Sequence, residues 1–129
     1  MFASCKQENH TIASYESFLS LLEEKGFHYV EEKADTRSYL SVERKPIVIG
    51  DEIISVFEYG SNTAMEADAA CIEPDGYGTT NGVRISWVSY PYFFKKDTII
   101  VNYVGENERI LTFLKKNYGD VFAGYRNIH

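Results

Sequence analysis

The sequence lacks any long apolar run. Nowhere do about 18 consecutive apolar residues occur, the approximate minimum for a helix that crosses a bilayer. Cysteine is scarce as well, since the 129 residues contain only Cys5 and Cys71. One bond between a terminal segment and a helix-like segment is a poor candidate for a disulfide framework, because small secreted domains usually build such frameworks from several pairs. These absences exclude a membrane-spanning helix within the given sequence and argue against a disulfide-stabilised scaffold.

Positive charge is also in short supply. Lys and Arg number 13 against 19 Asp and Glu, so the formal net charge is −6. The basic pairs Lys95-Lys96 and Lys115-Lys116 lie far apart in the chain. A nucleic-acid-binding protein needs a continuous basic surface that follows the phosphates, and an acidic surface repels phosphates and anionic lipid headgroups. We therefore expect no nucleic-acid partner, and contact with a membrane only through a lipid anchor.

Motifs for metal binding or catalysis are missing too. His10, His28 and His129 show no ligand spacing with one another or with the cysteines, so we expect no metal. Residues 76–82 lack the Lys-Ser/Thr ending of a phosphate-binding loop and precede a strand-like segment, so we interpret them as a polar loop and expect no cofactor. The one nucleophilic pair that the sequence offers is Cys71 with His28, and catalysis there would require the fold to bring them together.

The composition that remains is that of an ordinary globular protein. Hydrophobic residues make up 44% of the chain and charged residues 25%, and 129 residues suffice for one hydrophobic core. We predict one α+β domain over residues 14–125. Residues 1–13 would be an N-terminal tail or linker, and residues 126–129 a C-terminal tail.

Apolar periodicity indicates three helices. Ser14 is the expected N-cap of a helix over 14–25, and Asn107 caps a last helix over 107–117. A shorter helix is expected between residues 60 and 74, where a capping-box pattern is followed by an apolar stripe and then by Pro-Asp-Gly.

Alternating or β-branched segments indicate the strands. They are residues 27–32, 38–42, 46–49, 52–59, 83–87 and 98–104. Gly50-Asp51 predicts a hairpin, and a turn at Lys96-Asp97 joins a second antiparallel pair. The resulting order, α-β-β-β-β-α-β-β-α, lacks the alternation of a parallel sheet. We expect an antiparallel sheet of about five to six strands, with the three helices packed mainly on one face.

A dense aromatic segment beside the polar loop raises two interpretations. Its members and a neighbour in the loop are Tyr77, Trp87, Tyr90, Tyr92 and Phe93. Most large apolar side chains are buried, so a core role is the first interpretation. Alternation along a strand prevents all of them from facing one side, and exposed aromatics beside a loop are typical of recognition surfaces. The second interpretation is therefore a binding surface formed by these five residues.

The N-terminal segment contains a short targeting-like pattern. Phe2-Ala3-Ser4-Cys5 resembles the end of a bacterial lipobox, in which a signal peptide is cut before a cysteine that then carries lipid. The resemblance implies that Cys5 is a candidate lipidation site and that residues 6–13 are a linker. The alternative is that Cys5 is a thiol in a terminal tail.

A wider resemblance covers most of the domain. Its landmarks are Val56-Phe57-Glu58-Tyr59 before an Ala-rich helix, Pro74-Asp75-Gly76, Trp87-Val88 before a proline, Ile100-Val101-Asn102-Tyr103-Val104-Gly105, and Phe122-Ala123-Gly124. With these landmarks the chain resembles uncharacterised secreted or lipid-anchored bacterial proteins of the Gram-positive type. The resemblance implies an extracytoplasmic location and implies no activity, cofactor or catalytic residue.

Three functional hypotheses follow. The leading one is a non-catalytic extracytoplasmic lipoprotein domain that binds a protein or an envelope component. The alternative is a cytosolic acidic inhibitor or immunity-type protein that neutralises a basic partner, suggested by the net charge of −6. The third, an enzyme that uses Cys71 and His28, requires a reactive thiol.

Overall fold

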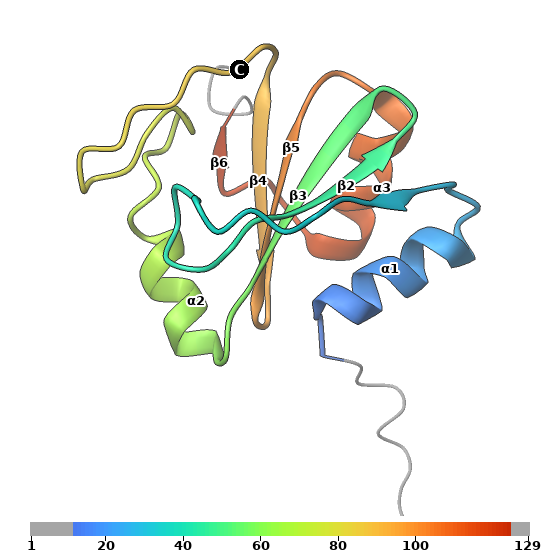
Figure 1. The fold of residues 1–129 in the computed structure, drawn as a ribbon, viewed down its shortest axis with the longest axis horizontal. Helices are drawn as coiled ribbons and strands as arrows, with labels where there is room; N and C mark the ends of the chain where they lie inside the picture. The colour runs from blue at the N-terminus through green and yellow to red at the C-terminus, as the bar shows by residue number, and fades with distance from the viewer. Residues whose placement is uncertain (1–11, 125–129) are drawn as a thin grey trace, which may run out of the picture.

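The computed structural model describes residues 12–124, which form three helices and six strands in one α+β domain (Figure 1). The helices are α1 (Tyr15–Glu24), α2 (Asn62–Ala69) and α3 (Glu108–Tyr118), and the strands are β1 (Val30–Glu31), β2 (Lys45–Ile49), β3 (Glu52–Glu58), β4 (Pro91–Lys96), β5 (Ile99–Val104) and β6 (Ala123–Gly124). All strand pairs are antiparallel, in the order β1-β2-β3-β5-β4-β6. The predicted fold class is confirmed, and the elements follow the predicted order with local differences.

Side-chain caps explain where the two longer helices begin. The Ser14 hydroxyl accepts a hydrogen bond from the Ser17 amide at 3.1 Å, and the Ser17 hydroxyl accepts one from the Ser14 amide at 2.8 Å. At α3 the Asn107 side chain accepts from the Ile110 amide at 3.0 Å, and Gly119 follows the helix with φ 85°. The predicted starts of the first and last helices are confirmed.

Two tight turns build the centre of the sheet. Gly50, with φ 61°, lies in the β2–β3 turn, and Asp97, with φ 52°, lies in the β4–β5 turn. Both residues occupy the left-handed region, which glycine adopts freely and aspartate tolerates better than most residues. The hairpin predicted at Gly50-Asp51 and the turn predicted at Lys96-Asp97 are therefore confirmed.

One predicted strand is replaced by a loop. Within residues 12–124, the segment 38–42 forms no strand. Tyr39, Leu40 and Val42 instead pack together against one face of the sheet. Their side chains are thus gathered on one side, whereas a strand would send alternate side chains to opposite faces.

The aromatic segment also pairs differently from the prediction. Among the described residues, 83–87 form no strand, and β4 begins at Pro91, a position where a strand tolerates the missing amide. The predicted strand over 27–32 is reduced to β1 at the sheet edge, and β6, which no pattern indicated, pairs with β4.

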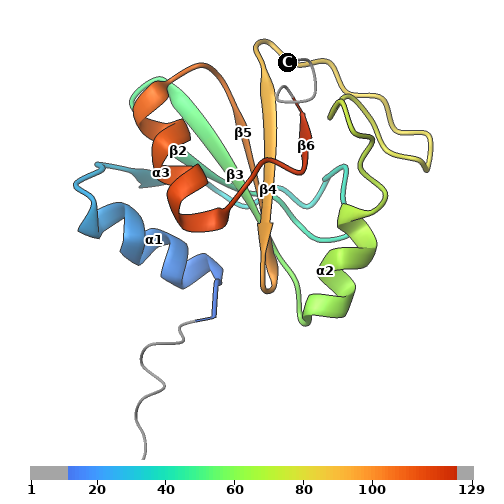
Figure 2. The ribbon, with the colours of Figure 1, turned by 180° about the vertical axis from the view of Figure 1, so that it is seen from behind.

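The buried side chains form two clusters. Helices α1 and α3 lie on one side of the sheet and α2 lies on the other (Figures 1 and 2). We call the face that packs against α1 and α3 the helical face, and the face that packs against α2 and segments 38–42 and 86–88 the loop face. The prediction that the helices share one face thus holds for α1 and α3, while α2 lies on the opposite side.

The helical face is closed by aromatic and aliphatic side chains. Phe18 and Leu22 of α1 are fully buried, and the Phe18 ring contacts Phe113 with centroids 6.0 Å apart and Tyr118 at 5.6 Å. Burying one such side chain stabilises a fold by roughly 1.5–3 kcal/mol. This core therefore holds both helices to the sheet.

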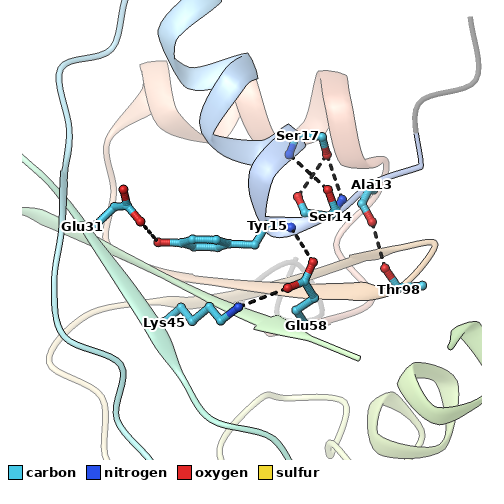
Figure 3. Close-up of polar contacts among 8 residues, drawn as sticks. All are labelled: Ala13, Ser14, Tyr15, Ser17, Glu31, Lys45, Glu58 and Thr98. Carbon is cyan, nitrogen blue, oxygen red and sulfur yellow. Dashed lines mark hydrogen bonds and ion pairs between the residues drawn. The ribbon is translucent and has the colours of Figure 1, made fainter. Parts of the chain in front are cut away.

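Polar contacts fix the start of α1 over β3 (Figure 3). The Glu58 carboxylate accepts hydrogen bonds from the Tyr15 amide at 3.0 Å and from the Lys45 ammonium at 3.1 Å, and Thr98 donates its hydroxyl to the Ala13 carbonyl at 3.0 Å. Burial alone would raise the Glu58 pKa, but the two hydrogen bonds and the Lys45 charge outweigh it and hold the pKa below its usual range. The Tyr15 hydroxyl donates to Glu31 at 2.7 Å, which ties α1 to the edge strand.

β6 and the loop before Trp87 meet backbone to backbone. The Gly124 amide donates to the Pro74 carbonyl at 2.8 Å, and a Cβ added at Gly76 would lie 3.1 Å from the Gly124 Cα. A Cβ added at Gly124 would overlap the Pro91 carbonyl, and both glycines have positive φ, of 79° and 118°. The Trp87 indole N–H donates to the Gly76 carbonyl at 2.8 Å. Two glycines thus allow the contact that holds Trp87 in place.

Candidate functional site

A cleft opens on the loop face beside segment 38–42. Its cavity measures about 310 Å³, and strands β3 and β5 form its floor. This volume is near the lower end of the range of roughly 300–1,000 Å³ that is usual for small-molecule sites. We refer to this cavity as the cleft.

Two buried polar residues form the floor. Ser55 in β3 is 5% exposed and Asn102 in β5 is 2% exposed, and the register places them directly opposite each other. Their neighbours on the same face, Phe57 and Ile100, are fully buried and apolar. A polar group in such a place destabilises the fold unless it is hydrogen-bonded, so this pair has to be held by specific partners.

Those partners come from the segment that precedes β2. Arg44 donates from Nη1 to the Ser55 hydroxyl at 2.9 Å, and the Tyr39 hydroxyl donates to the Asn102 side-chain oxygen at 2.9 Å. The Asn102 amide nitrogen donates to the Tyr92 carbonyl at 3.2 Å. The floor is therefore a small network that joins three strands to the loop above them.

Aromatic rings form one wall. Tyr39 and Trp87 meet edge to face, with centroids 5.8 Å apart, and Phe93 supports Trp87 from behind at 6.2 Å. Burial raises the pKa of Tyr39, against an opposing influence from the positive charge of Arg44. The Tyr39 hydroxyl thus keeps its proton at neutral pH and remains a hydrogen-bond donor.

Arg44 supplies the cationic group of the cleft. Its backbone pairs with that of Asp35 through hydrogen bonds of 2.9 and 2.8 Å, which place the side chain over β3. The ion pair between Arg44 Nη2 and the Asp35 carboxylate is long, at 3.9 Å, and both side chains are partly exposed. An exposed pair of this length contributes little stability, so the guanidinium is only loosely neutralised.

The rim is apolar and accessible. Ile53 is 49% exposed and Val88 is 100% exposed, and both line the cleft. A second hollow of about 420 Å³ adjoins it, and Arg44 and Ile53 line both. Large aliphatic side chains left exposed beside a polar floor are typical of a recognition surface.

The structure divides the five aromatic residues predicted as a binding surface. Trp87 lines the cleft, and it also borders a shallow hollow of about 340 Å³ together with Tyr77 and Tyr90. Tyr92 and Phe93 are buried and point to opposite faces, since Tyr92 stacks on Tyr103 in the core of the helical face. Those two residues are therefore core, because alternation along β4 turns both side chains inward.

Sequence reasoning missed the residues at the centre of the cleft. Ser55 and Asn102 each interrupt an otherwise apolar strand, in Ile-Ile-Ser-Val-Phe and in Ile-Ile-Val-Asn-Tyr-Val. A polar residue at a position predicted to be buried was the available signal. For Arg44 the sequence offered no such signal, because the role of this residue depends on how the preceding loop folds over the sheet.

Within the described residues, the one cysteine, Cys71, does not line the cleft. Cys5 lies outside the described residues. Cys71 follows α2 as a half-buried free thiol, and His28 is exposed in the connection between α1 and β1. No hydrogen bond joins Cys71 and His28 within residues 12–124, so the structure offers no support for the third hypothesis, an enzyme that uses this pair.

Metal-ligand clusters and membrane-spanning helices are both absent from the described part of the chain. Residues 12–124 contain no group of three or more His, Cys, Asp or Glu side chains that could hold a metal ion. In the same range, no helix is both long enough and apolar enough to cross a membrane.

No protein-family model, curated protein or solved structure matches this chain. The geometry of the cleft is therefore the basis for a functional proposal. It combines hydrogen-bond donors on the floor, one cation, an aromatic wall and an apolar rim.

Proposed function

We propose that this domain is a non-catalytic binding domain that holds a protein partner or an envelope component at the cleft. The observation that carries the proposal is the opening of the buried Ser55–Asn102 pair into a cavity with an exposed apolar rim. A sheet face that served only as core would place apolar side chains at both positions and cover them. Polar groups that converge in a recess with an apolar rim are typical of a binding site.

The chemistry of the cleft favours binding over catalysis. Its polar side chains include the serine, the asparagine, Tyr39 and Arg44, and the Ser55 hydroxyl accepts a hydrogen bond from the Arg44 guanidinium. A serine nucleophile needs a neighbouring base that removes its proton, and a guanidinium keeps its own proton at any ordinary pH. We therefore assign Ser55 to ligand contact.

A site-directed cross-linking experiment tests the position of the binding surface. A photoreactive phenylalanine analogue replaces Val88 on the cleft rim, and the matched control carries it at Thr112, an exposed position of α3. We expect a discrete adduct in the producing cells from the Val88 position only, competed by added wild-type protein and not by an Ile53→Glu variant. Equal adducts from both positions, or none from Val88, would contradict the proposal.

We propose in addition that Cys5 carries lipid and anchors the domain outside the cytoplasm. The support is the lipobox-like Phe2-Ala3-Ser4-Cys5. Expression of the gene with its native upstream region, followed by fractionation and mass analysis of Cys5, tests this part. A cytosolic product with an unmodified Cys5 thiol would end the anchoring proposal and would leave the cleft proposal intact.

The cytosolic inhibitor is the second candidate, and the net charge of −6 favours it. The two candidates differ in the interaction that holds the partner, which is contact with the cleft in the first and diffuse charge attraction in the second. A basic partner bound by diffuse charge dissociates as salt is raised, because the Debye length falls from about 10 Å at 0.1 M to about 3 Å at 1 M. Irradiation at high salt therefore discriminates between the two candidates. An adduct that still forms at high salt supports the cleft, and an adduct that forms only at low salt supports the inhibitor.

A further inference from the structure

We propose that the cleft recognises a carboxylate that is attached to an apolar group, as at the C-terminal end of a peptide. This inference rests on the proposed function, because it specifies the ligand chemistry of the same site. It follows from the donors on the floor, the apolar rim beside them and the loosely paired cation.

The polar groups of the floor have donors to spare. Within residues 12–124, Arg44 uses one N–H in a hydrogen bond to Ser55, although a guanidinium carries five. Among the described residues, the Ser55 hydroxyl accepts that bond and finds no acceptor of its own, and the Asn102 amide nitrogen uses one of its two hydrogens. The Asn102 oxygen already accepts from Tyr39. Hydrogen-bonding capacity that remains on these three residues thus consists largely of N–H and O–H groups.

Such a floor is complementary to a group that only accepts hydrogen bonds. An ionised carboxylate offers two oxygens and no donor, and its planar shape fits a guanidinium through paired hydrogen bonds. Arg44 borders the cleft, and its Nη1 lies 2.9 Å from the Ser55 hydroxyl on the floor. The positive charge is therefore directed at the floor, where such a carboxylate would lie.

The rim indicates what the carboxylate is attached to. Ile53, Val88 and Val104 line the cleft on the side of the floor that faces solvent. A charged group alone would leave these aliphatic side chains in water, whereas an aliphatic side chain next to the carboxylate would cover them. The cavity of about 310 Å³ has room for one amino-acid-sized group.

Asp35 and Asp51 modulate this site. Asp35 lies 3.9 Å from Arg44 and competes for its charge, and Asp51 also borders the cleft. Removal of the Asp35 charge in Asp35→Asn should free the guanidinium and strengthen carboxylate binding several-fold, because an opposite charge within about 4–6 Å acts directly on Arg44. A site that bound cations would show the reverse.

Trp87, the single tryptophan of the chain, reports on the cleft directly. The probe is acetyl-alanyl-leucine with a free carboxylate, and its matched control is the same dipeptide as the carboxamide. We expect the acid to shift the Trp87 fluorescence saturably. The amide should bind more weakly by roughly tenfold or more, because it lacks the charge-assisted hydrogen bond of the carboxylate. Acetyl-leucine serves as a second probe, because a pocket for free small acids would bind it as well as the dipeptide.

Variants locate the effect at one residue. Arg44→Gln should lower the affinity for the acid by roughly tenfold or more. Arg84→Gln is the matched control, because it makes the same charge change at a side chain that is 80% exposed and paired with Glu73 at 3.5 Å. The difference in affinity between acid and amide is measured on the wild-type protein. It therefore tests the carboxylate inference even if Arg44→Gln is poorly folded.

Equal affinity for acid and amide would overturn the carboxylate inference and leave the cleft as a binding site. The inference would also be overturned if neither of the two acids nor the control amide changed the Trp87 fluorescence. An unchanged affinity in Arg44→Gln would do the same. The proposed function itself fails only in the cross-linking experiment at Val88, so the two failures can be told apart.

Discussion

The helical face and the loop face use the same strands but cover them differently. On the helical face, α1 and α3 have capped ends, and their large side chains cover the sheet. Phe18 of α1, for example, packs against Phe113 of α3. On the loop face, α2 has eight residues, and polar Ser55 and Asn102 lie where the other face has apolar side chains. The comparison indicates that the helical face supplies most of the stability, and that the loop face keeps polar groups available at some cost in stability.

The strongest test of this comparison is Phe18→Ala. The substitution leaves a cavity under α1 and should lower the free energy of unfolding by about 3–5 kcal/mol. Urea denaturation followed by circular dichroism measures it. Ile53→Ala on the cleft rim is the control, with an expected loss below about 1 kcal/mol because its side chain is half exposed. Equal losses at the two positions would remove the distinction between the faces.

A smaller effect is expected for Tyr39→Phe. The variant keeps the ring against Trp87 but leaves the buried Asn102 oxygen without its donor, which should cost about 1–2 kcal/mol. Thermal and chemical unfolding measure the loss. Tyr29→Phe is the control, because the Tyr29 hydroxyl donates to Glu23 at an exposed position. A loss as small as that of the control would mean that the floor network is not a structural element.

Tyr118→Phe should have the opposite sign. Tyr118 is buried under α1, and its hydroxyl finds no hydrogen-bond partner within residues 12–124. Its removal should raise the free energy of unfolding by about 1 kcal/mol, because an unsatisfied buried hydroxyl is destabilising. A decrease would show that the hydroxyl is hydrogen-bonded in solution, and the helical face would then be less purely apolar than its contacts indicate.

The smallest effect concerns pH. The Glu58 pKa is lower in the folded protein than its ordinary value of 4.5, so the ionised carboxylate stabilises the fold at higher pH, and this contribution is lost as the pH falls through the folded pKa. Between about pH 6 and about pH 3, wild type should therefore lose more stability than Glu58→Gln. Glu106→Gln, at an exposed position, should follow wild type. Parallel curves for Glu58→Gln and wild type would show that the anchor of α1 does not depend on this charge.

Much of the fold was predictable because its signals are local. Ser14 and Asn107 cap helices through residues three positions away, and Gly50 determines a hairpin between adjacent strands. The loop at 38–42 was not predictable in this way. Its apolar residues could have formed a strand, and only contact with the loop face decided otherwise.

The candidate site was the least predictable part for the same reason. Ser55 and Asn102 meet because β5, and not β4, pairs with β3, and no local pattern indicates that strand order. For Trp87 the sequence left a core role and a binding surface open, and the structure places its ring in the wall of the cleft. Its partners depend on long-range pairing, which periodicity alone does not specify.

The backbone contact between Gly76 and Gly124 ties the geometry of the cleft to the far end of the sheet. The Gly76 carbonyl holds the indole of Trp87, while the Gly76 Cα has just enough room beside β6. A methyl group added at Gly124 would overlap the Pro91 carbonyl and displace β6 from β4. The displacement would reach the Gly76 loop and the aromatic wall without contacting Ser55 or Asn102. Substitutions that alter the shape of the cleft can therefore arise at a position that does not line it.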